Sequence, residues 1–250
     1  MLRRKQRPNF LQDLQKSWIE KSIDNHLSGG KFGGAYSGFF SPSYVGKPDR
    51  ELFLDYSGLR SEPIAPELRR ILENGSSMHD RYAKYFRDMG ILQSVEANVT
   101  WNSPPIRGRL DIVIITLDNS LCLVEMKSKN NNLFSKMQIP DWGHIVQWGI
   151  YAKLSQIYDG CILYENKDNQ RLRIFQMLLT SSGDLRIFEN NNTVFSAEKF
   201  IETIFDNMLY VKKCYDTNKI PERCEKCFSK CLSISICENL EKGKEILIKE

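Results

Sequence analysis

The chain has 250 residues, of which 41% are hydrophobic and 26% charged, and its formal net charge is +4. This length can bury a sizeable core without disulfides, and the composition excludes a disordered or fibrous chain. No apolar run approaches a membrane span and the first residues lack the apolar core of a signal peptide, so we expect a cytoplasmic protein without a membrane partner. The small positive charge is compatible with a polyanionic partner but does not require one.

The first forty residues predict a helical segment and a glycine-rich loop. Apolar residues at helical spacing favour a helix up to about residue 28. No Gly-Lys-Ser/Thr closes the glycine-rich run at residues 29–34, which excludes a Walker-type ATP site there. For most of the aromatic residues that follow, core packing is favoured over stacking on bases.

The middle of the chain predicts a helix followed by strands. Pro63 and Pro66 are expected to break the chain before a helix over about 76–89. The second and third strands should form a hairpin that turns at residues 118–120. Residues 112–115 are apolar on both alternating faces, as expected of a central strand covered by helices. The three strand candidates are residues 93–102, 107–116 and 121–128.

The remaining elements complete an α/β (α+β) fold, with a mixed central β-sheet flanked by helices. They are a helix over 142–155, strands near 161–165 and 171–180, and an amphipathic helix near 196–214. We expect three segments: an N-terminal helical segment with the glycine-rich loop (1–40), a core domain (41–215) and a C-terminal cysteine cluster with a tail (216–250).

Two carboxylates and a lysine are expected to meet at the hairpin. Side chains alternate along a strand, so Glu125 and Lys127 share one face while Met126 points to the other. If the hairpin turns at its Asp-Asn pair, paired residue numbers sum to about 237, which places Asp111 opposite this segment. Two carboxylates with room for water and a phosphate suit Mg²⁺ or Mn²⁺ better than a closed zinc cage.

Further residues could complete such a site. His79 would add a nitrogen ligand and favour Mn²⁺ if its helix packs across this edge, and the backbone carbonyl of Met126 is another candidate ligand. Lys127 could orient water or offset charge on an attacked phosphate. Gln147 and Tyr151 are four residues apart, so on a helix they share a face that could contact DNA or the lysine. Each motif alone is common, but in this order they favour a metal-dependent site for phosphodiester hydrolysis.

These motifs resemble those of the PD-(D/E)XK nuclease superfamily, and within it the RecB-like exonuclease branch. Asp111 matches the acidic residue of the second motif, and Glu125-Met126-Lys127 matches the E-x-K core. The histidine motif and the Q-x-x-x-Y motif of that branch are similar to Gly75-x-x-x-His79 and Gln147-x-x-x-Tyr151.

The resemblance covers residues 40–237 and implies a restriction-endonuclease-like core. It also implies a role for each motif residue: metal ligation by His79, Asp111 and Glu125, catalysis by Lys127, and DNA contact or active-site support by Gln147 and Tyr151.

Four cysteines lie close together near the C-terminus: Cys224, Cys227, Cys231 and Cys237. Such a group in an intracellular protein usually holds a metal. It resembles the C-terminal cysteines of iron–sulfur members of the same branch, such as the AddB nuclease domain and the CRISPR-adaptation nucleases. Those proteins add one N-terminal cysteine, where Lys47 and Pro48 stand here, so the fourth ligand could be the extra C-terminal cysteine or Cys214. The resemblance favours a structural [4Fe-4S] cluster, with Zn²⁺ as the alternative.

The remaining two cysteines, Cys122 and Cys161, are expected to be small buried hydrophobic residues.

We therefore expect a Mg²⁺- or Mn²⁺-dependent deoxyribonuclease, an exonuclease acting on DNA ends or single strands. Recombination, repair, phage DNA processing and CRISPR adaptation are compatible settings, with the host cytoplasm as location for a phage protein. No helicase motif is present, so unwinding would need a helicase or recombination partner. One alternative is a catalytically weak DNA-binding or complex-assembly module that retains the nuclease fold. Another is a zinc-stabilised interaction protein in which the motifs are coincidental.

Overall fold

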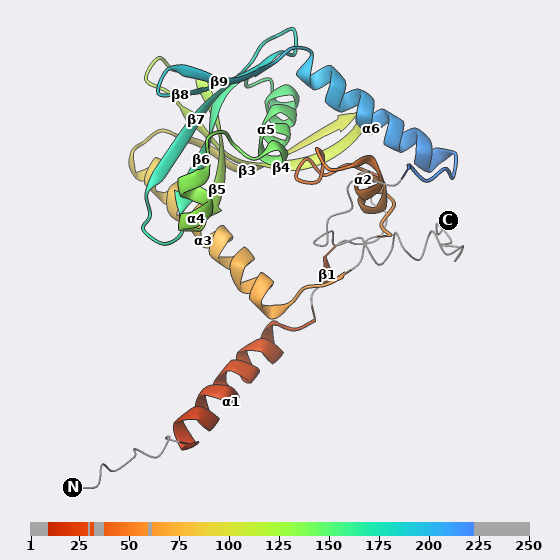
Figure 1. The fold of residues 1–250 in the computed structure, drawn as a ribbon. Helices are drawn as coiled ribbons and strands as arrows, with labels where there is room; N and C mark the ends of the chain where they lie inside the picture. Colours follow the sequence, from red (N-terminus) through yellow and green to blue (C-terminus); the bar gives the residue numbers. More distant parts are fainter. Residues whose placement is uncertain (1–9, 30, 33–37, 60–61, 223–250) are drawn as a thin grey trace, which may run out of the picture.

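A computed structural model describes residues 10–29, 31–32, 38–59 and 62–222. A seven-stranded sheet forms the body, with its strands in sequence order from β3 to β9 (Figure 1). Neighbouring strands are antiparallel except β5 and β6, which are parallel. The strands are β3 (Leu92–Asn102), β4 (Pro105–Ile115), β5 (Leu121–Lys129), β6 (Asp159–Asn166), β7 (Leu172–Leu179), β8 (Leu185–Glu189) and β9 (Asn192–Ala197).

Helices cover both faces of this sheet. A parallel pair needs a crossover, and between β5 and β6 it is made by α4 (Asn131–Lys136) and α5 (Trp142–Ser155). On one face, α5 and α6 (Phe200–Asp216) contribute to the larger of two hydrophobic cores. On the other face, α3 (Pro66–Asp88) closes the smaller core. The expected mixed sheet flanked by helices is confirmed.

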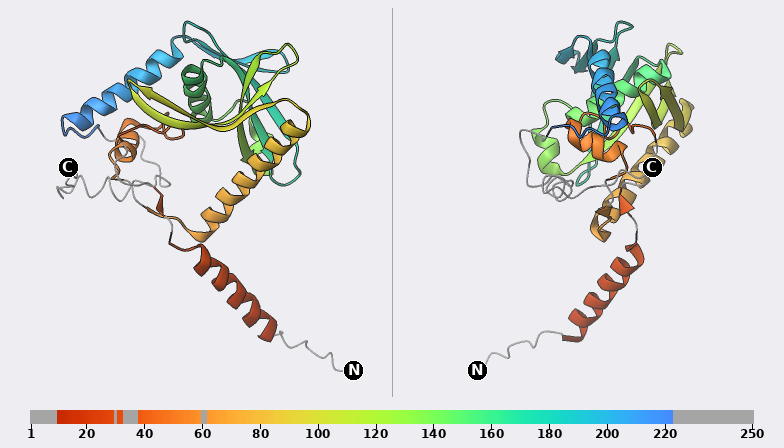
Figure 2. Two further views of the ribbon diagram at one scale, coloured as in Figure 1. Left: turned by 180° about the vertical axis from the view of Figure 1, so that it is seen from behind. Right: turned by 90° about the vertical axis from the view of Figure 1, so that its right-hand side faces the viewer.

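The other elements lie at the side of the body. The helix α2 (Asp49–Tyr56) packs on α6. The short strands β1 (Lys31–Phe32) and β2 (Glu62–Pro63) pair with each other. Figure 2 shows α1 (Phe10–Leu27) projecting away from the body beyond the start of α3. Arg70 of α3 holds it through an ion pair to Asp24, with a separation of 2.5 Å.

Two tight contacts fix α5, the helix that carries Gln147 and Tyr151. Trp148 is fully buried, and its indole N–H donates to the carbonyl of Leu123 on β5 at 3.2 Å. Gly149 faces α6, where an added Cβ would lie 2.5 Å from the Phe200 ring. The close approach of α5 and α6 therefore requires glycine at this position.

Several expected boundaries were wrong, for identifiable reasons. Pro66 does not interrupt the chain but begins α3, because the first turn of a helix needs no N–H donor. Between the expected strand at 121–128 and the expected helix at 142–155 the chain forms an additional helix, α4, whose N-cap Asn130 accepts a hydrogen bond from the Leu133 N–H at 2.9 Å. The helix expected from residue 196 begins at Phe200, and the hairpin of β8 and β9 precedes it.

The expectation for the central cysteines was only partly correct. Cys122 and Cys161 are partly exposed at the edge of the smaller core, with their thiols in contact. Cys214 is buried in the larger core on α6. Within the described ranges, no helix is long and apolar enough to cross a membrane.

Candidate active site

The hairpin of β4 and β5 brings Asp111 to the E-x-K segment. Ile112 lies opposite Val124, so the register differs by one residue from the expected one and sets Asp111 level with Glu125. Residues opposite each other in a ladder point to the same side of the sheet. The Asp111 carboxylate accepts a hydrogen bond from the Met126 N–H at 2.9 Å. Its position is therefore fixed by the backbone of β5.

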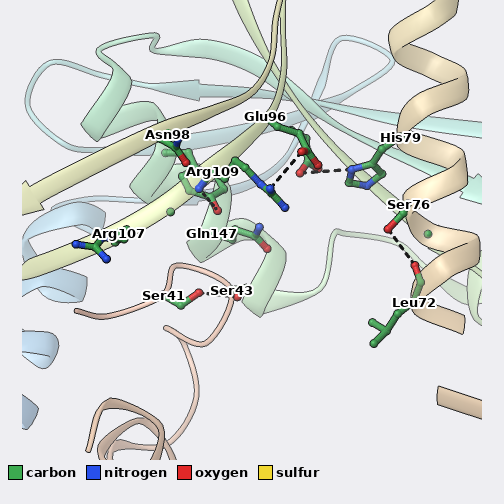
Figure 3. A pocket seen from close by; sticks show the side chains of 14 residues that line it. Ser41, Ser43, Leu72, Ser76, His79, Glu96, Asn98, Arg107, Arg109 and Gln147 are labelled. Atoms are coloured by element: carbon green, nitrogen blue, oxygen red, sulfur yellow. Dashed lines mark hydrogen bonds and ion pairs between the residues drawn. The ribbon is translucent and has the colours of Figure 1, made fainter. Parts of the chain in front are cut away.

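His79 reaches the same point from α3. Figure 3 shows His79 on this helix at the border of the cleft. Its Nδ1 lies 3.7 Å from Oδ1 of Asp111. The helix is held on the sheet by the buried carboxylate of Glu165 on β6, which accepts hydrogen bonds from Arg81 at 2.6 Å and from the Tyr82 hydroxyl at 2.7 Å. Since these two donors follow His79 within one turn, the ion pair and hydrogen bond set the position of the imidazole.

Glu125 and Lys127 form an ion pair in which only the carboxylate is fully buried. Glu125 is fully buried, and its Oε1 lies 2.5 Å from the Lys127 ammonium. Burial raises the Glu125 pKa to about 8; Lys127 opposes this rise and the negative Asp111 adds to it. Burial lowers the Lys127 pKa, but the attraction of Glu125 and Asp111 outweighs it, so that the net pKa lies above its ordinary value. The ammonium therefore stays charged in this pair.

Both oxygens of the Glu125 carboxylate are available to accept a hydrogen bond or to bind a cation. Despite the ion pair, neither of its oxygens accepts a hydrogen bond of regular geometry from the described residues. A buried carboxylate with free lone pairs is costly, and a divalent cation would satisfy it. The donor set of Asp111, Glu125 and His79 fits Mg²⁺ or Mn²⁺ in this respect. In the described part of the chain, however, no three His, Cys, Asp or Glu side chains already converge as a metal cage.

Alternation along β5 is as expected. Met126 is buried in the smaller core under α3, whereas Leu123, on the same face as Glu125, belongs to the larger core. The Met126 N–H is taken by Asp111. A ligand role for the Met126 carbonyl stays a prediction.

Gln147 and Tyr151 lie together at the wall of the site. Both are buried on α5, and the Tyr151 hydroxyl accepts a long hydrogen bond from the Arg109 N–H at 3.4 Å. Burial, followed by the nearby Glu125, raises the Tyr151 pKa to about 12, so the phenol is neutral. An added Cβ at Gly108 would lie 2.7 Å from the Tyr151 ring. The glycine before Arg109 thus allows this tyrosine to pass against β4.

These side chains border a polar cleft of about 550 Å³ between α3, β3, β4 and the loop around residue 42 (Figure 3). Besides the residues with an expected role, the cleft is lined by polar side chains to which the sequence assigned none: Ser41, Ser43, Ser76, Glu96, Asn98, Arg107 and Arg109. The alternation of Arg107, Arg109 and Asp111 along one strand was the available signal for the two arginines.

His144 is a further residue that the sequence did not identify. It lies on the first turn of α5, and its Nδ1 shares a hydrogen bond of 2.7 Å with the Tyr164 hydroxyl. Burial, with the nearby positive charge of Lys127, lowers the His144 pKa to about 4. A neutral imidazole therefore lies near the lysine of the E-x-K segment.

The structure thus gathers His79, Asp111, Glu125, Lys127, Gln147 and Tyr151 around one site. The expected metal cluster at Cys224, Cys227, Cys231 and Cys237 lies outside the described residues.

Comparisons with known proteins give little further information. No protein-family model matches the chain. No curated protein matches it either. Among solved structures, the crystal structure of SSO0001 aligns with a TM-score of 0.44 and 15% sequence identity, over 91% of this chain and 97% of that chain. A likeness at this level carries no argument about function.

Proposed function

We propose that the protein is a metal-dependent DNA nuclease of the PD-(D/E)XK superfamily, and an exonuclease acting on DNA ends or single strands. The observation that carries the proposal is the fully buried Glu125, whose oxygens lack regular hydrogen bonds among the described residues, set between Asp111 and Lys127 beside a polar cleft. The order of α3, three antiparallel strands, α5 and a parallel strand is compatible with the restriction-endonuclease-like core that the motifs imply.

We assign each residue a role that its position supports. Asp111, Glu125 and His79 would hold Mg²⁺ or Mn²⁺, with the Met126 carbonyl as a further ligand. When bound, such a cation supplies Lewis-acid stabilisation of the attacked phosphate and activation of water. Lys127 keeps its charge and would orient water or offset charge on the phosphate.

Gln147 and Tyr151 would support this arrangement from α5. Tyr151 is fixed against Gly108 and the Arg109 N–H, and Gln147 contacts Tyr151. Their neutral side chains can donate and accept hydrogen bonds at the edge of the cleft without adding charge. We expect them to position DNA rather than to transfer protons.

The cleft supports a polyanionic substrate. Arg107 and Arg109 line it together with serine and asparagine side chains, which are suitable partners for phosphate oxygens. The proposal includes a structural [4Fe-4S] cluster, or Zn²⁺, at the C-terminal cysteines and a helicase or recombination partner for unwinding.

A second candidate is a catalytically weak DNA-binding or assembly module with the same fold. Two observations favour it. Glu125 forms an ion pair with Lys127, and among the side chains that the structure describes no three potential metal ligands lie close enough together to bind a cation. The two candidates differ in whether cleavage requires Asp111.

A cleavage assay separates them. Anaerobically purified protein is incubated with end-labelled linear DNA and closed circular single-stranded DNA, in Mg²⁺, Mn²⁺ or EDTA. Asp111→Asn is the test variant, because an amide oxygen can still accept from the Met126 N–H. Asp88→Asn, at an exposed position at the end of α3, is the matched control.

We expect metal-dependent loss of linear DNA by the wild type and the control, cleavage at the EDTA background for Asp111→Asn, and sparing of the circle. Cleavage of neither substrate by folded protein would favour the binding module. Cleavage that persists in Asp111→Asn would remove this aspartate from the site.

A further inference from the structure

Three charged side chains follow one another along β4 and face the cleft. Arg107, Arg109 and Asp111 line it, whereas Ile106, which precedes Arg107, and Leu110, which lies between Arg109 and Asp111, are buried in the larger core. Alternate side chains on a strand are about 6.6 Å apart. Figure 3 shows Arg107 and Arg109 in succession along the strand, with His79 beyond them on α3. Two guanidinium groups therefore lie in line with the candidate cleavage site.

The outer arginine rests on an aromatic ring. The Arg107 guanidinium carbon lies 4.1 Å from the centroid of Phe39. This ring is held beside β4 because the Phe40 N–H donates to Pro105 O at 2.8 Å and the Arg107 N–H donates to Phe40 O at 3.0 Å. Phe40 itself is buried and stacks on Tyr56, with ring centroids 4.2 Å apart.

Stacking leaves the edge of the Arg107 guanidinium available. Its N–H donors point outward in the plane of the group, in the fork that matches phosphate oxygens. Among the residues that the structure describes, no acidic side chain forms an ion pair with Arg107, whereas Arg81, Arg109 and Arg173 each have one. Arg107 is thus oriented by an uncharged partner, without a competing carboxylate.

The inner arginine has a partner that a phosphate can replace. Arg109 lies 3.2 Å from Glu96, and both side chains are about half exposed, so the pair is worth little in water. Glu96 has a left-handed backbone with φ of 49° in the middle of β3, a conformation that costs a non-glycine residue free energy. The exposed pair holds Arg109 at the cleft, and exchanging Glu96 for a phosphate would cost little.

We infer that β4 carries a two-phosphate track for single-stranded DNA, in which Arg107 on Phe39 binds the outer phosphate and Arg109 the inner one, next to the phosphate at Asp111. The spacing of alternate side chains is close to the separation of neighbouring phosphates along one strand. A cleft of about 550 Å³ lined by these two arginines has room for the backbone of one strand. The inference rests on the proposed function, because it takes Asp111 as the point of cleavage.

The salt dependence of binding tests the track directly. Each phosphate contact of a single strand contributes about 0.7 to the slope of log K against log salt concentration. Binding of fluorescent single-stranded and duplex DNA is measured by anisotropy in metal-free buffer, on the Asp111→Asn background so that the DNA stays intact. The variants are Arg107→Gln, Arg109→Gln, the pair together, and Phe39→Ala. Arg186→Gln, at an exposed position on β8, is the matched control.

We expect each cleft arginine variant to lower the single-strand slope by about 0.7, and the pair by about 1.4. Affinity should fall on the order of tenfold for each, as for the loss of a charge-assisted hydrogen bond. Phe39→Ala should weaken binding while keeping most of the slope, since it removes orientation but no charge. Arg186→Gln should change neither quantity, and melting curves of all variants check that the fold is intact.

Unchanged slope and affinity in Arg107→Gln would overturn the inference, as would equal losses for duplex and single strand or no DNA binding at all. The proposed function can fail separately. A reduced slope in a protein that does not cleave DNA with Mg²⁺ or Mn²⁺ supports the track and refutes the nuclease. Asp111-dependent cleavage with an unchanged slope supports the nuclease and refutes the track.

Discussion

Replacing Glu125 by glutamine should remove a specific pH dependence of stability. The carboxyl group is fully buried, and burial next to the negative Asp111 raises its pKa to about 8 from an ordinary value of 4.5, although Lys127 opposes the rise. A group whose pKa is raised in the folded state binds its proton more tightly there than in the unfolded chain. Its contribution to stability is therefore complete below about pH 4.5 and is lost progressively as the pH rises towards 8.

The size of the effect follows from these pKa values. Between pH 6 and pH 8 the unfolded carboxyl group is ionised throughout, whereas the folded one goes from almost fully protonated to half protonated. The corresponding loss of unfolding free energy is about 2 kcal/mol. For a chain of this length that loss amounts to about 4–8 °C in melting temperature. Because Glu125 and Lys127 each shift the pKa of the other, the effect belongs to the pair and not to Glu125 alone.

Thermal or urea unfolding at pH 6, 7 and 8 measures the effect in the wild type and in Glu125→Gln. The difference between the two proteins is the relevant quantity, because titrating groups that do not contact Glu125 contribute equally to both. Glu202→Gln, at an exposed position on α6, should follow the wild type. Mn²⁺ at pH 8 should restore stability to the wild type more than to Glu125→Gln, since a cation that binds only the folded state stabilises it. Identical pH dependence in the wild type and Glu125→Gln would refute the reasoning.

Three further substitutions test the surroundings of the site. Gly75→Ala should raise the melting temperature by about 1–4 °C, because the new Cβ meets nothing within 4 Å and helical glycine is unfavourable; a decrease would contradict this. Gly108→Ala should cost about 1–3 kcal/mol in urea unfolding and reduce cleavage more than Tyr151→Phe, since the Cβ would displace the whole ring. Glu165→Gln should cost about 2 kcal/mol and lower kcat, because it removes the ion pair with Arg81 that holds the helix carrying His79; unchanged kcat would show that this anchor does not position the site.

The sequence predicted the hairpin of β4 and β5 and the helix α5 more accurately than the strands that precede α6. The hairpin of β4 and β5 has an apolar strand, a polar turn and a strong alternation, and each of these signals is local. The helix α5 was correct at both ends, Trp142 and Ser155. By contrast, the hairpin of β8 and β9 consists of strands of five and six residues just before α6. In this region helical and strand periodicities overlap, and the longer helix signal dominated.

The residues of the site also fall into two groups, those that the sequence could identify and those that it could not. His79, Asp111, Glu125 and Lys127 could be named because each belongs to a short motif and three of them share one hairpin. Other residues depend on pairings between distant segments, such as Arg107 on Phe39 and His144 with Tyr164. The left-handed backbone of Glu96 has no sequence signal, since it is neither glycine nor asparagine.

At position 125, the side chain that would stabilise the fold most differs from the one that the proposed function needs. A neutral side chain of similar shape would be more stable at this position, because a buried carboxylate loses hydration and here receives only the Lys127 ammonium in return. The contribution of Glu125 to the stability of the apoprotein should therefore fall as the pH rises towards 8 and the carboxylate ionises. Cation binding also requires the ionised carboxylate, so metal affinity should rise over the same pH range in which apoprotein stability falls. A purely structural role for the pair would give the loss of stability without the gain in metal affinity, and a titration calorimeter distinguishes the two.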